Sequence, residues 1–196
     1  MSVLTLPSSF RAESFNMRLL TTEKSFASPF GGSEQVIDLL NDRWLITLSL
    51  PRGTQEDAAR NEAFINALRG MTNTCLLWHM KRRVPLGTMR GTPTAQAAAV
   101  GAGSLNINTI AGATLVAGDM ISVSGLLLQV FEDATANGAG LLTVNLANRL
   151  RTAVTAGAAV TWDKPTAQFR KVSAPGFQYF TGYAEGASID FVEAVG

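Results

Sequence analysis

The chain has 196 residues, of which 46% are hydrophobic and only 16% are charged, and its formal net charge is +1. This length suffices for one domain whose core needs no disulfide or metal, or for a domain with a smaller one inserted. The near-neutral charge argues against a chain that binds nucleic acid or a membrane with its whole surface. The lone cysteine, Cys75, cannot form an intramolecular disulfide, and we expect it to be a buried structural thiol.

The N-terminal sequence also bears on the compartment. The stretch MSVLTLPSSFRAESF has no positively charged segment followed by a long apolar core, so we expect no signal peptide. No apolar run approaches the roughly 18 residues that span a bilayer. We therefore expect the protein to be made and folded in a cytoplasm.

The first 51 residues predict strands. Within residues 13–30, apolar residues alternate with polar ones and would share one face of a strand: Phe15, Met17 and Leu19. The stretch EQVIDLLNDRWLITLSLP, residues 34–51, predicts a hairpin with a tight turn at Asn41 and Asp42, because both residues tolerate left-handed backbone angles. Its second strand would bury the face that carries Trp44, Ile46, Leu48 and Leu50.

One helix is predicted over residues 54–69. Thr54 suits the N-cap, and Gly70 suits the C-terminal stop. Its apolar stripe consists of Phe64, Ile65 and Leu68, which we expect to pack on a sheet that includes Trp44. A short buried strand, TCLLWHM, and a basic, turn-rich stretch, KRRVPLGTMRG, follow this helix.

The composition changes after residue 90. Residues 91–163 contain only six charged residues, and the tract TPTAQAAAVGAG at their start resembles a linker. Five short strands are predicted in SLNIN, DMISV, LLLQVFE, LLTVNL and AAVTW. Turns would separate them at Ala117-Gly118, Ser124-Gly125, Asn137-Gly138 and Ala156-Gly157. Five strands at this spacing favour a small β-barrel of the SH3-like or OB-like kind.

Charge and aromatic residues return after residue 163. Residues 177–183 alternate as one strand, Glu185-Gly186 suits a turn, and a last strand contains Ile189 and Phe191. The predicted fold class is therefore mainly β, with one packed helix. A β-sandwich formed by residues 1–90 and 164–196 would carry an inserted barrel formed by residues 91–163.

The residues that usually perform catalysis form no recognisable constellation. His79 is the only histidine and has neither a cysteine pair nor a second histidine with which to bind a metal, so we expect a structural role. The glycine-rich stretches lack the Lys-Ser/Thr of a phosphate-binding loop. We predict no catalytic residue, no metal and no cofactor.

Four basic residues lie close together in the sequence: Lys81, Arg82, Arg83 and Arg90. They would contact nucleic acid through its phosphates, form a solvated hairpin tip or meet an acidic neighbour in an assembly. In a ring-shaped oligomer, this loop would line a channel that passes DNA or lie between subunits.

The order of these elements resembles that of a known family. A hairpin that ends in DRWLITLSLP is followed by one helix, by PLGTMRGTP, by a low-charge insertion containing AGDMISVSGLLLQV, and by PTAQFRKVS and SIDFVEAV. This order resembles the distal tail proteins of long-tailed bacteriophages. The resemblance implies a β-sandwich with a helix, related to the tail-tube fold, and a hexameric ring that joins the tail tube to the baseplate or tail-tip hub. It also implies a place in the virion tail, with no membrane.

Three alternatives remain open at this point. Within the same class, the protein would be a tail completion or head–tail connector protein. A host-surface carbohydrate-binding module is a second alternative, although residues 91–163 contain only Phe131 and Trp162 as aromatic residues. A hydrolase is a third, and the missing histidine–acid–nucleophile signature counts against it.

Overall fold

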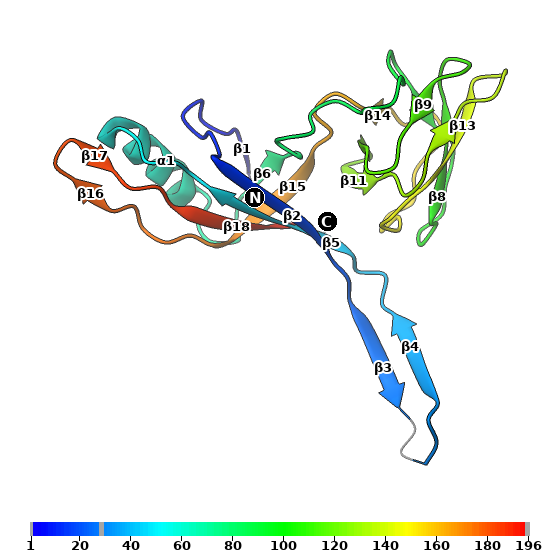
Figure 1. Ribbon diagram of the computed structural model, residues 1–196, viewed down its shortest axis with the longest axis horizontal. Coiled ribbons are helices and arrows are strands. Elements are labelled where there is room, and N and C mark those ends of the chain that lie inside the picture. Colours follow the sequence, from blue (N-terminus) through cyan, green and yellow to red (C-terminus); the bar gives the residue numbers. More distant parts are fainter. Residues whose placement is uncertain (1, 28–29, 195–196) are drawn as a thin grey trace.

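The protein is mainly β with one α-helix, in a computed structural model that describes residues 2–27 and 30–194 (Figure 1). The first 90 residues contain β1 (Val3–Leu4), β2 (Ser14–Leu20), β3 (Glu23–Ala27), β4 (Glu34–Asp38), β5 (Arg43–Ser49), α1 (Gln55–Ala67) and β6 (Thr74–Leu77). The last part contains β15 (Ala167–Ser173), β16 (Tyr179–Phe180), β17 (Tyr183–Ala184) and β18 (Ser188–Glu193). The mainly β class predicted from the sequence is confirmed.

A six-stranded sheet joins the two ends of the chain, in the order β1-β6-β15-β18-β5-β2. Only β1 and β6 pair in parallel; the other neighbours are antiparallel. Along β5, the predicted alternation holds, because Trp44, Ile46 and Leu48 are buried while the residues between them are half-buried. One face of this sheet therefore forms a core, as expected for a strand with a period of two residues.

Helix α1 begins and ends where its capping residues predict. The Thr54 hydroxyl accepts a hydrogen bond from the backbone N–H of Asp57 at 3.1 Å, and Gly70 has φ = +66° just beyond the helix. Phe64, Ile65 and Leu68 are buried in the same core cluster as Trp44, on the covered face of the sheet. The helix is thus anchored by the apolar stripe that its sequence predicts.

Residues 91–163 form three small sheets. Their strands are β7 (Thr94–Ala95), β8 (Ser104–Asn108), β9 (Thr114–Leu115), β10 (Met120–Val123), β11 (Leu126–Gln129), β12 (Ala134–Thr135), β13 (Leu141–Asn145) and β14 (Val160–Thr161). The sheets have the orders β11-β10-β14, β12-β9 and β13-β8-β7, with no closed barrel of paired strands among the described residues. All five strands predicted here are present.

The predicted linker at the start of this segment is wrong. Ala95 is fully buried in the core of residues 91–163, and β7 pairs with β8. Ala98 forms a bridge with Val154, so the alanine-rich tract is fixed by strand pairing. Small residues here mark close packing of strands, because alanine side chains allow neighbouring backbones to approach.

The buried residues divide into two clusters. One cluster draws its residues from positions 89–160, and the other mainly from positions 10–77 and 167–191. Two residues of the middle segment, Met120 and Leu127, belong to the second cluster. The middle segment therefore packs directly against the six-stranded sheet.

Two hairpins differ from the sequence prediction. The turn expected at Asn41 and Asp42 is wrong, because β5 pairs with β2 and β18, and β4 pairs with β3 instead. Residues 177–183 were predicted as one strand, yet they fold back at Gly182 (φ = +87°) to pair β16 with β17. In both cases a short alternation fits one long strand and a bent pair equally well, because periodicity carries no information on where the chain reverses.

Within the described ranges, no helix is long and apolar enough to cross a membrane.

Candidate interaction surfaces

The hairpin formed by β3 and β4, together with the connecting residues 30–33, extends away from the rest of the molecule (Figure 1). We call this segment, residues 23–27 and 30–38, the arm. All ten residues of its two strands are exposed, in contrast to the half-buried strands of the main sheet. Phe30, near the tip, is 98% exposed. A two-stranded ribbon of this kind is at best marginally stable alone in water.

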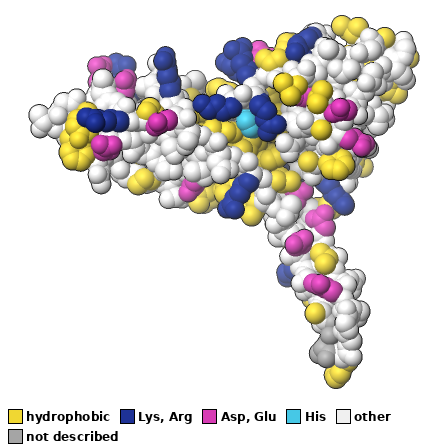
Figure 2. Space-filling view, viewed as in Figure 1, with side chains coloured by type: hydrophobic (Ala, Val, Ile, Leu, Met, Phe, Trp, Pro, Cys, Tyr) yellow, Lys and Arg dark blue, Asp and Glu magenta, His cyan; other side chains and the backbone are white. Residues whose placement is uncertain are grey.

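The two faces of the arm differ in chemistry. Pairing places Phe26 opposite Gln35 and Lys24 opposite Ile37, so one face carries two large apolar side chains. The other face carries the acidic residues Glu23, Glu34 and Asp38, with Val36 among them. Figure 2 shows apolar and acidic side chains distributed along the arm. An exposed apolar surface on a protruding ribbon is typical of a segment that contacts another molecule.

The arm is not predicted from the sequence, although one signal for it is present. Gly31 and Gly32 follow Phe30 between two strand-like stretches, and a glycine pair in that position favours a hairpin turn. The Asn41-Asp42 pair also fits a hairpin turn, and the sequence alone does not show which pair forms one. The Asn41-Asp42 pair lies where the arm joins the sheet, and the preceding Leu40 has φ = +52°.

The main sheet has a free edge next to the arm. Strand β2 occupies this edge over seven residues and contains no proline, and it leads directly into β3. The opposite edge is formed by β1, which has only two residues. Free edges present unpaired backbone N–H and C=O groups that another strand can bind.

The basic loop between β6 and β7 is partly tied down by its own neighbours. The Arg82 guanidinium donates to the Gly118 carbonyl at 2.7 Å. Arg83 donates to both carboxylate oxygens of Asp163, at 2.8 and 3.2 Å. This hydrogen bond, more than the charge of Arg83, lowers the pKa of Asp163. Lys81 is exposed on the same loop.

Arg90, the fourth basic residue of the loop, is bound by backbone groups of the loop itself. Its guanidinium donates to the backbone carbonyl groups of Pro85, Gly87 and Met89, at 2.6 to 3.2 Å. It also lies 5.0 Å from the centre of the Trp162 ring. Arg90 therefore holds the loop in shape, while Lys81, Arg82 and Arg83 remain on the exposed side. The prediction that this loop lines a channel or an interface stays a prediction.

His79 lies beside the aromatic ring of Phe15, with ring centres 4.7 Å apart. Its Nδ1 and Nε2 atoms are 3.0 and 3.2 Å from the backbone nitrogen and the Nε of Arg82. Burial, and then the charge of Arg82, lower its pKa. No group of three or more metal-ligating side chains occurs among the described residues.

Acidification is expected to destabilise the fold through His79. Because the folded-state pKa lies below the unfolded-state value, the neutral imidazole favours folding. Its contribution is complete above the unfolded-state pKa of about 6.5 and is lost as the pH falls through the folded-state pKa. Urea unfolding of the wild type and His79→Gln between about pH 8 and pH 5 measures this effect. The wild type should lose more stability than the variant, and parallel losses would contradict the prediction.

Cys75 is fully buried on β6, with its Sγ atom 3.9 Å from the Phe169 carbonyl oxygen. Burial raises the pKa of its thiol to about 12. Because the thiolate is the reactive form, we expect the folded protein to react with a disulfide reagent at least ~10³-fold more slowly than the urea-unfolded chain at the same pH. Absorbance of the released thiol measures both rates. Rapid, stoichiometric labelling of the folded protein would contradict a buried thiol.

Comparisons with known proteins add no family: no family model matches this chain, and a search of curated proteins finds no match.

Proposed function

We propose that this protein is a non-enzymatic structural protein of a bacteriophage tail. In this proposal it is a distal-tail-type subunit that forms a ring, and the ring joins the tail tube to the baseplate or tail-tip hub. Its partners are other copies of itself, a hexamer by family resemblance, together with the tail tube protein and the hub protein. DNA would pass through the ring, and assembly would take place in the host cytoplasm.

The observation that carries the proposal is the arm. Phe26, Val36 and Ile37 are all exposed on a ribbon whose two strands, among the described residues, pair only with each other. Full burial of one such side chain against a partner would contribute about 1.5–3 kcal/mol of hydrophobic free energy to association. A subunit that completes its apolar contacts only on a neighbour is suited to assembly.

Three further features support the proposal. The β2 edge is available for pairing, and the charged fraction of 16% is low, as interface cores require. The order of elements resembles that of distal tail proteins.

We extend the proposal to the finer fold: a tail-tube-type β-sandwich in which residues 91–163 form a separate, SH3-like or OB-like unit.

Light scattering after size-exclusion chromatography, at several protein concentrations and at low and moderate salt, tests the proposal. We expect a discrete closed oligomer, with a hexamer at six times the 20.8 kDa subunit mass. A monomer at every concentration would overturn the self-closing ring and favour a connector that docks singly.

A variant tests the role of the arm. The double substitution Phe26→Ser and Ile37→Ser removes both large apolar side chains from one face of the ribbon. We expect folded monomers with the far-UV circular dichroism spectrum of the wild type, because neither residue belongs to a core cluster. Phe131→Ser is the matched control, since Phe131 is an exposed phenylalanine on residues 91–163. An arm variant as oligomeric as the control would remove the arm from the interface.

A further inference from the structure

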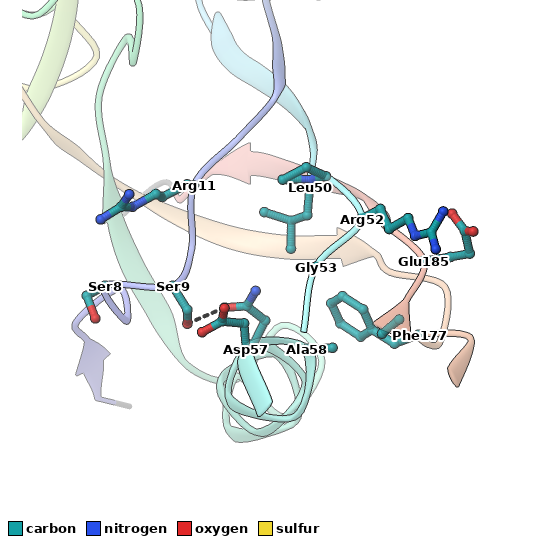
Figure 3. A pocket seen from close by; sticks show the side chains of 13 residues that line it. Ser8, Ser9, Arg11, Leu50, Arg52, Gly53, Asp57, Ala58, Phe177 and Glu185 are labelled. Atoms are coloured by element: carbon teal, nitrogen blue, oxygen red, sulfur yellow. Dashed lines mark hydrogen bonds between the residues drawn. The ribbon is translucent and has the colours of Figure 1, made fainter. Parts of the chain in front are cut away.

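A cavity of about 380 Å³ opens where the N-terminal segment, the first turns of α1 and the β17–β18 connection meet (Figure 3). This volume falls within the range of small-molecule sites in proteins. The cavity lies away from the arm and from the basic loop: its lining residues come from positions 8–11, 50–61 and 177–185. Three stretches that are distant in sequence therefore converge on one polar hollow.

The charges around the cavity are balanced. Arg11 and Arg52 contribute two cations, while Asp57 and Glu185 contribute two carboxylates. In Figure 3, Arg52 and Glu185 lie beside each other at one end and Arg11 lies at the other. A lining with equal numbers of both signs favours neither an anion nor a cation. It offers both strong donors and strong acceptors, which suits a neutral ligand whose groups can do both.

Asn61 supplies a buried polar group to the same cavity. Its side chain is only 6% exposed, and its Oδ1 atom accepts a hydrogen bond from the Ser9 hydroxyl at 2.8 Å (Figure 3, dashed line). Its amide nitrogen donates no hydrogen bond to another described residue. The amide nitrogen can therefore donate to an oxygen atom of a ligand without giving up a bond within the protein.

An aromatic surface completes the cavity. The Phe177 ring points into it between Gly53 and Ala58 (Figure 3). At the rim, the Arg52 guanidinium lies 3.4 Å from the centre of the Tyr183 ring, and Tyr183 stacks on Phe180 at 5.1 Å. Arg52 is therefore held in position before any ligand arrives. A half-exposed aromatic ring packs well against the C–H face of a flat aliphatic ring.

We propose that this cavity binds one ring of a neutral saccharide. Each sugar hydroxyl both donates and accepts a hydrogen bond, so it matches a lining that mixes guanidinium, carboxylate and amide groups. Asn61 and Arg52 donate to the hydroxyl oxygens, Glu185 and Asp57 accept from the hydroxyl groups, and Phe177 packs on the C–H face. The proposal does not rest on ring assembly, because none of these residues belongs to the arm or to the β2 edge.

The test is an NMR titration of ¹⁵N-labelled protein with maltose, lactose and diacetylchitobiose, each at millimolar concentrations, and with inorganic phosphate for comparison. We expect saturable shifts of the Asn61 side-chain amide and of backbone amides around Phe177 with at least one saccharide. Glu185→Gln and Phe177→Ala should each weaken that binding about 10-fold, which corresponds to roughly 1.4 kcal/mol. Glu132→Gln, an exposed carboxylate variant on residues 91–163, should leave it unchanged.

Several results would overturn the saccharide site. One is the absence of cavity shifts with all three saccharides. Another is binding that both cavity variants retain while their thermal midpoints match the wild type. A third is a stronger shift of the same resonances with phosphate, which would make the cavity an anion site. The oligomeric state, measured separately by light scattering, should be the same in the wild type and in both cavity variants.

Discussion

Arg151→Ala is expected to lower the free energy of unfolding by about 3–5 kcal/mol, because it leaves a buried carboxylate without its counter-charge. Arg151 donates two hydrogen bonds to the Glu193 carboxylate, one of them 2.9 Å long, and their side chains are 9% and 1% exposed. The same carboxylate accepts from the backbone N–H of Trp44 at 3.1 Å. This pair links residues 91–163 to the last strand of the main sheet.

Arg149→Ala is the matched control. Arg149 lies two residues away and pairs with Asp38 at 3.7 Å, but both side chains are about half exposed. Solvent screens such a pair, so its loss should cost at most about 1 kcal/mol. Urea unfolding of the two variants and the wild type, followed by far-UV circular dichroism, gives the comparison. Equal losses in both variants would mean that burial of the Arg151–Glu193 pair is not what makes it important.

Gly87→Ala is expected to destabilise the protein by about 3 kcal/mol, because no space exists for a methyl group. A Cβ atom at this position would lie 2.2 Å from the Thr114 carbonyl oxygen and 2.7 Å from the Leu115 Cα. These are backbone atoms of a neighbouring segment and cannot rotate away. Residue 87 is also held by its N–H, which donates to the buried Asp119 carboxylate at 3.0 Å. That carboxylate accepts from Leu86 and Val116 as well.

Gly138→Ala provides the comparison for this second variant. A Cβ atom at Gly138 would meet nothing within 4 Å, and the φ angle of this residue lies outside the left-handed range that favours glycine. We expect it to change stability by less than about 1 kcal/mol, or to raise it slightly by restricting the unfolded chain. Thermal unfolding measured by calorimetry would separate the two. A Gly87→Ala protein as stable as Gly138→Ala would show that the loop at 86–87 shifts without cost.

The elements that the sequence predicts best are those whose signals are local. The helix at 54–69 combines an N-cap, a first-turn acid, an apolar stripe and a terminal glycine, and each of these acts within a few residues. Five of the eight strands of residues 91–163 are also predicted, because turns with positive φ at Gly118, Gly125 and Gly157 separate short apolar runs, whereas the two-residue strands β7, β9 and β12 are not. Local chemistry alone determines these boundaries.

Strand pairing is harder to predict, because it depends on residues far apart in the chain. Strands β4 and β5 are adjacent in sequence and would form an obvious hairpin, yet β5 lies between β2 and β18. The partner of Trp44 across β2 is Leu19, which is separated from it by the whole arm. Nothing in the alternation of either strand distinguishes these two arrangements.

The candidate surfaces show the same limit. The four basic residues 81–90 are close in sequence, yet Arg90 turns toward its own loop carbonyl groups while Lys81 is exposed. The polar cavity, in contrast, brings Ser9, Asn61 and Glu185 together from distant positions. A sequence pattern shows which groups exist but not which of them converge, because convergence follows from tertiary packing.

Strands β6 and β15, which flank residues 91–163 in the chain, are antiparallel neighbours in the main sheet, with Leu77 opposite Ala167. The segment's entry and exit also run side by side, since the Lys164 N–H donates to the Arg83 carbonyl and the Val160 N–H to the Pro93 carbonyl. The seventy or so codons for residues 91–163 therefore lie at the position in the gene that encodes the tip of the hairpin formed by β6 and β15. A short turn at that tip would reconnect the sheet without rerouting any strand, although it would also remove Arg151 from the buried Glu193 and the Leu127 carbonyl from the Trp44 indole.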